Sequence, residues 1–277
     1  KTGSGKSNFI HVLIHSLCHQ YSPEELSLYL LDYKEGTEFN IYANPFLPHA
    51  RLVATESDIE YGVTVLRHLK SELQRRSDLF KQMGTPDYRD FRRNSSQVIP
   101  RILLIVDEFQ KLFAGDRASS EEAEKHLNDL LRQGRSFGIH VMLATQTIRG
   151  LQNQSIGQLV SNLGCRIALS CSGEDSALLL GSSNWDAASL QSPPEGIINS
   201  ENGIKSANVV FNIPFAKKEL RIQRQQYLLT EAQKRKILFE NKIFNGNILP
   251  AVPPIDAFVH VCNQPGFSVY LGVTHDF

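Results

Sequence analysis

Hydrophobic residues follow two different spacings along roughly the first two hundred residues of the chain. Residues 26–31 and 101–106 are short and almost continuously apolar, which predicts central strands that are buried on both faces. Residues 8–19 and 56–83 place apolar side chains three and four positions apart, which predicts amphipathic helices. Strands that alternate with helices in this way are typical of an α/β fold with a mostly parallel sheet flanked by helices.

Further elements follow from the same pattern. Residues 139–144 and 166–170 are expected to form two more strands, and residues 208–213 a last strand. Ser119 and Glu122 have the spacing of a capping box, so we expect a helix to begin there. In the long helix predicted before them, four basic residues are expected on the polar side: Arg67, Lys70, Arg75 and Arg76.

The composition changes after Pro214. The chain becomes rich in Lys, Arg and Gln and then enters a proline-rich stretch at residues 250–254. This change predicts a helix followed by a linker. We therefore divide the chain into a core over residues 1–215 and a helix with a linker over residues 216–277.

The overall composition excludes several classes of protein. With 41% hydrophobic residues, the 277-residue chain can bury a sizeable core, which excludes a disordered tail. The 29 basic and 29 acidic residues give a net charge of zero, so any contact with nucleic acid must be a local patch. Four cysteines occur without a C-x-x-C pair, which fits a reducing compartment and argues against a zinc ribbon.

The chain shows no sign of a membrane segment or a targeting peptide. No apolar run approaches the ~20 residues that a membrane-spanning helix needs, and the N-terminus has no charged-then-apolar leader. We therefore expect a cytoplasmic location, with any membrane tether supplied by a part of the parent protein outside this sequence.

The first seven residues contain a glycine-rich motif. Lys1-Thr2-Gly3-Ser4-Gly5-Lys6-Ser7 matches the phosphate loop G-x-x-x-x-G-K-[ST] except for its first glycine, which we interpret as a sign of a fragment. Residues Thr2, Gly3, Ser4 and Gly5 would wrap around the phosphates of ATP. Lys6 would reach the β/γ oxygens, and the Ser7 hydroxyl would ligate Mg²⁺. A flexible N-terminal tail is the alternative reading.

Polar residues that follow two predicted strands supply partners for this loop. Asp107 ends a buried strand and is expected to hold Mg²⁺, while Glu108 is expected to act as the general base for the attacking water. Gln146 follows the next strand, where its amide could hydrogen-bond the water and the γ-phosphate. The alternative is that these three side chains are merely solvated strand ends.

A series of short motifs resembles the FtsK/SpoIIIE branch of the HerA–FtsK motor ATPases. The matching pieces are residues 1–7, Leu30-Leu31-Asp32-Tyr33-Lys34, Glu72-Leu73-Gln74-Arg75-Arg76, residues 99–109, residues 132–140, residues 144–146, and Cys165-Arg166-Ile167-Ala168-Leu169. Together they cover about residues 1–213 in the order of the family. This coverage is far more specific than a phosphate loop alone.

The resemblance implies a RecA-like P-loop core that works as a homo-oligomeric ring, usually a hexamer that pumps double-stranded DNA. It also implies that ATP lies between subunits, where an arginine of the neighbouring subunit completes the site. Arg166 is the first candidate for this arginine and Arg135 the second. The alternative for each is a structural ion pair.

Two features depart from the DNA motors. Tyr33 stands where the family usually has a proline, and nothing after Pro214 resembles their winged-helix module. Instead, residues 267–273 resemble the entry to another ATPase unit. A related branch, the EccC/EssC ATPases, carries several such domains in tandem and drives type VII protein secretion.

Three functions remain open from the sequence. The leading interpretation is an ATP-hydrolysing motor domain that translocates double-stranded DNA. The second is a tandem ATPase domain of a type VII-like protein-secretion motor, next to further ATPase domains in the parent chain. The third is a nucleotide-binding assembly module with little turnover, against which the presence of Glu108 and Gln146 argues.

Overall fold

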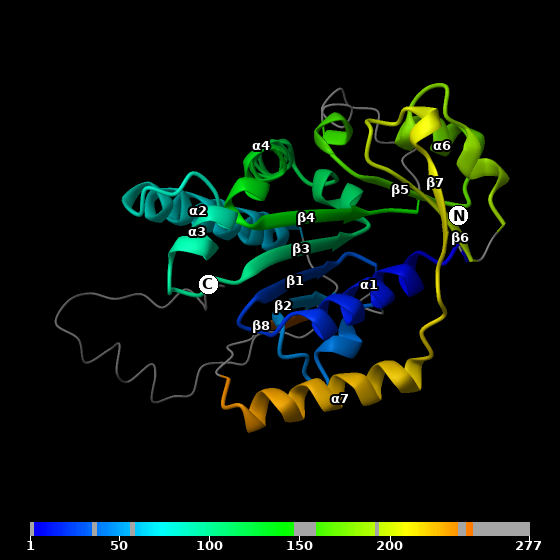
Figure 1. Cartoon of the computed structure of the whole chain (residues 1–277). Coiled ribbons are helices and arrows are strands. Elements are labelled where there is room, and N and C mark those ends of the chain that lie inside the picture. The colour runs from blue at the N-terminus through cyan, green and yellow to red at the C-terminus, as the bar shows by residue number, and fades with distance from the viewer. Residues whose placement is uncertain are drawn as a thin grey trace, which may run out of the picture.

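A parallel sheet of five strands forms the centre of the structure, a computed structural model that describes residues 3–34, 38–55, 59–146, 159–191, 194–237 and 242–245. The strands lie in the order β4-β3-β1-β2-β8, and each neighbouring pair is parallel (Figure 1). Their bounds are Leu26–Asp32 (β1), Ala50–Thr55 (β2), Arg101–Asp107 (β3), Ile139–Ala144 (β4) and Lys242–Asn245 (β8).

Helices cover both faces of this sheet. Figure 1 shows α2 and α4 over one face and α1 and α7 over the other. The bounds of the helices around the main sheet are Lys6–Gln20 (α1), Ile59–Gln82 (α2), Tyr88–Asn94 (α3), Arg117–Gln133 (α4) and Lys218–Lys234 (α7). Three 3₁₀ turns accompany them: Asn40–Tyr42 (η1), Phe109–Phe113 (η2) and Gly134–Phe137 (η3).

Strand β1 divides its side chains between two hydrophobic cores. Leu28 and Leu30 pack with Ile14 of α1, whereas Leu31 packs with Leu66 of α2 on the opposite face. Because successive side chains of a strand point to opposite faces, a strand covered on both sides needs an almost continuously apolar sequence. The predicted central strands and the mostly parallel sheet are therefore confirmed.

A separate antiparallel sheet lies beside the main one. It has the order β5-β6-β7, with bounds Arg166–Leu169, Glu195–Asn199 and Val209–Asn212. The helical segments associated with it are α6 (Gly173–Leu180), η4 (Asp186–Ser189) and η5 (Lys205–Ala207). The strands predicted at 166–170 and 208–213 are confirmed, but the second is not the last strand, because β8 follows it and pairs with β2. The four residues of β8 are too few to show a hydrophobic periodicity.

The helix expected after Pro214 is α7, and it packs on the core. Gln225 is buried and donates to the carbonyl oxygens of Ile41, at 2.8 Å, and of Pro45. Leu228 packs against the core between α1 and the sheet. Residues after 216 therefore cover the main sheet through α7 and extend it through β8. The domain division near residue 215 stays a prediction, and the proline-rich stretch and residues 267–273 lie outside the described residues.

The start of α4 differs from the expected capping box. The N-cap is Asp116, whose carboxylate accepts a hydrogen bond from the backbone N–H of Ser119 at 2.9 Å. The expectation that Ser119 and Glu122 form the cap is therefore wrong by one turn. An aspartate satisfies the free N–H groups of a first turn as well as a serine does. Glu122 instead pairs with Arg67 of α2 at 2.8 Å.

Helix α2 carries a buried arginine on the side predicted to be polar. The side chain of Arg76 is only 1% exposed, and its Nε lies 2.7 Å from Glu72 Oε1. Its other N–H groups donate to the carbonyl oxygens of Pro100 and Phe137, at 2.8 Å and 3.0 Å. Arg76 therefore ties α2 to the segments that enter β3 and β4, while Arg75 is exposed as expected.

At 24 residues α2 is long enough to span a bilayer, but its polar side carries several charged residues. No helix in the described part of the chain is both long and apolar enough to cross a membrane.

The buried position of Arg76 leads to a stability prediction. Arg76→Met should lower the free energy of unfolding by about 3 kcal/mol, because Glu72 and two backbone carbonyls lose a buried partner. Arg75→Met is the matched control and should change it by less than about 0.5 kcal/mol, since Arg75 is exposed. Urea denaturation measures both values, and equal losses would contradict the structural role of Arg76.

Candidate functional site

The glycine-rich segment turns directly into α1. Gly3 and Gly5 have φ angles of 83° and 94°, in the left-handed region that glycine adopts without a Cβ clash. Helix α1 begins at Lys6, so the free N–H groups of its first turn favour an anion at this point. A hollow of about 270 Å³ opens on the segment and is lined by Gly3, Ser4, Gly5, Lys6, Ser7, Asn8, Lys34 and Gln146. Lys1 and Thr2 lie outside the described residues.

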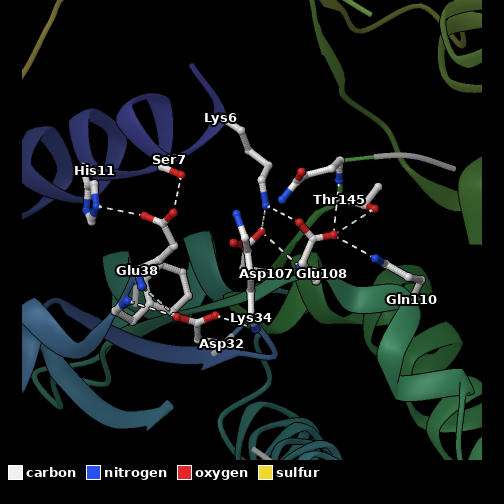
Figure 2. A network of polar contacts seen from close by, with 12 residues as sticks. Lys6, Ser7, His11, Asp32, Lys34, Glu38, Asp107, Glu108, Gln110 and Thr145 are labelled. Atoms are coloured by element: carbon white, nitrogen blue, oxygen red, sulfur yellow. Dashed lines mark hydrogen bonds and ion pairs between the residues drawn. The ribbon is translucent and has the colours of Figure 1, made fainter. Parts of the chain in front are cut away.

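The acidic end of β3 lies beside this hollow. Lys6 Nζ forms an ion pair with Asp107 and lies 2.9 Å from Glu108 Oε1 (Figure 2). The Asp107 side chain is fully buried, and burial raises its pKa, although Lys6 opposes this increase. The fold thus brings together the predicted lysine and the two predicted carboxylates, which are more than 100 positions apart in the sequence.

Glu108 is held both by its backbone and by its side chain. Its φ of 53° places a non-glycine residue in the left-handed region, at a cost of about 1–3 kcal/mol of the kind often found at active sites. Glu108 Oε2 accepts a hydrogen bond from Gln110 Nε2 at 2.8 Å. Burial disfavours the charged form of Glu108, but the hydrogen bonds from Gln110 and Lys6 hold its pKa below the ordinary value. An ionised carboxylate in this position is able to accept a proton from water.

The end of β4 reaches the same carboxylate. The backbone N–H of Gln146 donates to Glu108 Oε2 at 3.3 Å, and Thr145 Oγ1 donates to it at 3.4 Å. Gln146 also lines the hollow beside the phosphate loop. The structure therefore brings Gln146 to Glu108 and Lys6. Gln110 and Thr145 were not expected from the sequence, although each lies within two positions of a predicted site residue.

The residues proposed for Mg²⁺ have suitable donor atoms. Carboxylate and hydroxyl oxygens are the ligands that Mg²⁺ prefers, and Asp107 Oδ2 is buried without a hydrogen-bond partner in the described part of the chain. Among the described residues, no three His, Cys, Asp or Glu side chains group closely enough to hold a metal ion by themselves. Ser7 and Asp107 would therefore hold the ion together with phosphate and water oxygens.

A second pair of carboxylates, Asp32 and Glu38, lies beside the first (Figure 2). Asp32 ends β1 and accepts hydrogen bonds from the backbone N–H groups of Lys34 and Glu38, each at 2.9 Å. Glu38 Oε1 in turn accepts a hydrogen bond from Ser7 Oγ at 2.6 Å. His11 and Ser7 lower the pKa of Glu38 to about 2, against the opposing effect of burial.

This second pair was missed in the sequence analysis. Asp32 follows a buried strand as Asp107 does, so the same signal could have identified it. Parallel pairing places Asp32 directly opposite Asp107 in the sheet. Glu38 has no comparable signal, because it lies six positions beyond the end of β1.

The two candidate arginines lie in different environments. Arg166, at the start of β5, donates to four backbone carbonyl oxygens at 3.3–3.4 Å: those of Val160, Leu179, Leu180 and Asn202. These contacts tie β5 to its neighbours within one chain and favour the structural alternative for Arg166. Arg135 is exposed in η3, which precedes β4 at the sheet edge opposite the phosphate loop (Figure 1).

An apolar cleft separates β4 from the small sheet. It has a volume of about 310 Å³, is lined along both β4 and β5, and reaches Ser4 and Lys6. In the described part of the chain, β4 pairs only with β3 and β5 only with β6.

Sequence comparisons place these residues in a family. A profile of the FtsK/SpoIIIE family matches residues 1–176. The ESX secretion system protein YukB of Bacillus subtilis (strain 168) is 33% identical over 213 residues, which cover 73% of this chain and 13% of that protein. The type VII secretion system protein EssC of Staphylococcus aureus (strain NCTC 8325 / PS 47) is 31% identical over 173 residues, 61% of this chain and 11% of that protein. The chain thus spans about an eighth of the length of these relatives.

Solved structures share the fold. The cytoplasmic domain of the Thermomonospora curvata type VII secretion ATPase EccC matches with a TM-score of 0.66 and 25% identity, over 82% of this chain and 27% of that chain. The pCW3 conjugation coupling protein TcpA, a monomer form with ATPγS, matches with a TM-score of 0.67 and 19% identity, over 83% and 62%. These neighbours confirm the expected RecA-like P-loop fold. Because the family profile includes the glycine-rich loop, the acidic end of β3 and Gln146, this chain belongs to the FtsK/SpoIIIE family of P-loop ATPases.

Proposed function

We propose that this chain is an ATP-hydrolysing domain of a type VII-like protein-secretion motor. The observation that carries the proposal is its similarity to YukB, EssC and EccC, all named for secretion systems. The expectation that double-stranded DNA is the cargo finds no support among these relatives. The balanced charge of 29 basic and 29 acidic residues also provides no general basic surface for a duplex.

In the proposed reaction, the loop from Gly3 to Ser7 binds the phosphates of ATP, and Lys6 exchanges its carboxylate partners for phosphate oxygens. Ser7 and Asp107 hold Mg²⁺, which neutralises charge on the phosphates when it is bound. Glu108 orients the attacking water and accepts its proton. The Gln146 amide hydrogen-bonds the γ-phosphate, and this contact exists only while the γ-phosphate is bound.

The assembly is part of the proposal. Such domains would work in a ring or in tandem with further ATPase domains of the parent chain, on the cytoplasmic side of a membrane to which another part of the parent is tethered. An arginine from the adjacent domain would stabilise charge that develops on the transferred phosphoryl group. Since Arg166 binds carbonyls of its own chain, we favour Arg135 for this role.

Hydrolysis is tested with two substitutions in the full-length protein. Glu108→Gln should bind ATP but hydrolyse it roughly 10²–10⁴-fold more slowly, because an amide cannot accept the proton of water. Lys6→Ala should lose productive ATP binding, and Glu121→Gln, on the exposed side of α4, should behave as the unaltered protein. Phosphate release and nucleotide binding are measured for each. Near-normal turnover of Glu108→Gln would place the base elsewhere, and an unaltered protein without turnover would favour the nucleotide-binding assembly module.

The cargo is tested by stimulation and by export. Duplex DNA should leave the turnover of the full-length protein unchanged, whereas a protein substrate of the same secretion system should raise it. In cells, Glu108→Gln should abolish export of that substrate into the medium, as measured by immunoblot, and Glu121→Gln should not. Strong stimulation by duplex DNA together with normal export by Glu108→Gln would restore the DNA-translocation interpretation.

The arginine is tested by mixing variants. Arg135→Ala should leave the ATP affinity of the full-length protein almost unchanged and lower its turnover, because the charge is needed chiefly in the transition state. Assemblies that mix Arg135→Ala with Glu108→Gln should regain activity where an intact arginine meets an intact glutamate. Rescue in mixtures with Arg166→Ala instead would assign the role to Arg166. Rescue in neither mixture would leave both arginines structural.

A further inference from the structure

Ser7 directs its hydroxyl proton to an unexpected carboxylate. Ser7 Oγ donates to Glu38 Oε1 at 2.6 Å. Asp107, the other proposed Mg²⁺ ligand, is held instead by Lys6 and by the backbone N–H of Glu108, which donates to Asp107 Oδ1 at 3.0 Å. Ser7 therefore donates its proton to Glu38 and not to Asp107, which keeps its contacts with Lys6 and Glu108.

The chemistry of a serine ligand makes this acceptor important. A hydroxyl has one proton and two lone pairs, and it binds a cation through a lone pair. Its proton then needs an acceptor on the side of the oxygen away from the cation. An ionised carboxylate accepts a stronger hydrogen bond than a neutral group does. Such an outer partner fixes the orientation of a metal ligand, and its loss typically costs about 10–100-fold in metal affinity.

Glu38 is held in position by the protein itself. Asp32 Oδ2 accepts the backbone N–H of Glu38 at 2.9 Å and that of Phe39 at 3.3 Å. On the far side, His11 Nε2 lies 3.7 Å from Glu38 Oε2, and His11 Nδ1 lies 2.7 Å from the hydroxyl oxygen of Tyr42. The Glu38 side chain is 20% exposed and lies between α1 and Asp32 (Figure 2). Contacts within the protein therefore hold Glu38 beside Ser7.

We propose that Glu38 is the positioning residue for Ser7 in Mg²⁺-dependent nucleotide binding. By accepting the Ser7 proton, Glu38 keeps a lone pair of Oγ available to the cation and becomes an outer part of the metal site. The role rests on the proposed function, because it requires that the hollow beside Lys6 binds a magnesium nucleotide. It adds a residue that no strand end or phosphate-loop motif identifies.

The test separates binding with the metal from binding without it. The full-length protein is titrated with a fluorescent ATP analogue in Mg²⁺ and again in EDTA. Glu38→Ala should weaken binding in Mg²⁺ by about 10-fold or more and raise the half-saturating Mg²⁺ concentration. Its affinity in EDTA should stay unchanged, which also shows that the site is folded. The affinity of Glu38→Gln in Mg²⁺ should fall between those of the unaltered protein and Glu38→Ala, since its amide oxygen still accepts the proton but carries no charge.

Two further variants separate positioning from a general effect. Ser7→Ala combined with Glu38→Ala should bind no more weakly in Mg²⁺ than Ser7→Ala alone, because both act through one hydrogen bond. Glu121→Ala, an exposed glutamate of α4, is the matched control and should match the unaltered protein in both solutions.

Each other result would overturn the proposal. Unchanged Mg²⁺ dependence in Glu38→Ala would show that Ser7 needs no such acceptor. Tighter binding in Mg²⁺ would show that Glu38 competes with the cation, and additive losses in the double variant would assign Glu38 a separate role. The proposed function itself would fail if the unaltered protein bound no analogue in either solution. It would stand if, in EDTA, Lys6→Ala were the only variant that lost binding of the analogue.

Discussion

Three carboxylates are buried where β1 and β3 end, and the groups that compensate them organise the whole site. Asp32 and Asp107 have no exposed surface, and Glu108 is 5% exposed. A buried carboxylate without a partner costs several kcal/mol, so N–H groups and cations must meet each of them. Lys6 meets the pair on β3, and backbone N–H groups of the following loop meet Asp32. The phosphate loop, β3 and the loop after β1 are therefore held together by one electrostatic requirement.

The same need for compensating charge explains the partners of Lys6 and Ser7. Lys6 is engaged with Asp107 and Glu108, and Ser7 with Glu38, so each side chain proposed to meet phosphate or cation already has an opposite charge or an acceptor beside it. An anion in the hollow would take the place of the two carboxylates at Lys6, while Glu38 would keep the proton of Ser7. Preorganised charges of this kind need little rearrangement during a reaction.

Another buried charge stabilises the end of the sheet at which β3 and β4 begin. Arg76 of α2 donates to the carbonyl oxygen of Phe137, the last residue of η3. The exposed Arg135 lies in the same short turn. A fully buried arginine thus supports the element that carries the candidate residue for a neighbouring subunit. The proposed hydrolytic groups and the proposed trans-acting group accordingly lie at opposite ends of parallel strands, an arrangement compatible with the proposed contact between neighbouring domains.

The sequence by itself determined the local features of this protein, because they depend on neighbouring residues. Apolar periodicity specifies the central strands and long helices, and a glycine-rich turn before a helix specifies a phosphate loop. Tertiary structure alone decided which groups meet across the chain. No spacing indicates that Arg76 is buried, that β8 closes the sheet beside β2, or that Ser7 meets Glu38. These contacts depend on strand order and loop course, and the free energy that selects them comes from packing and charge compensation between distant segments.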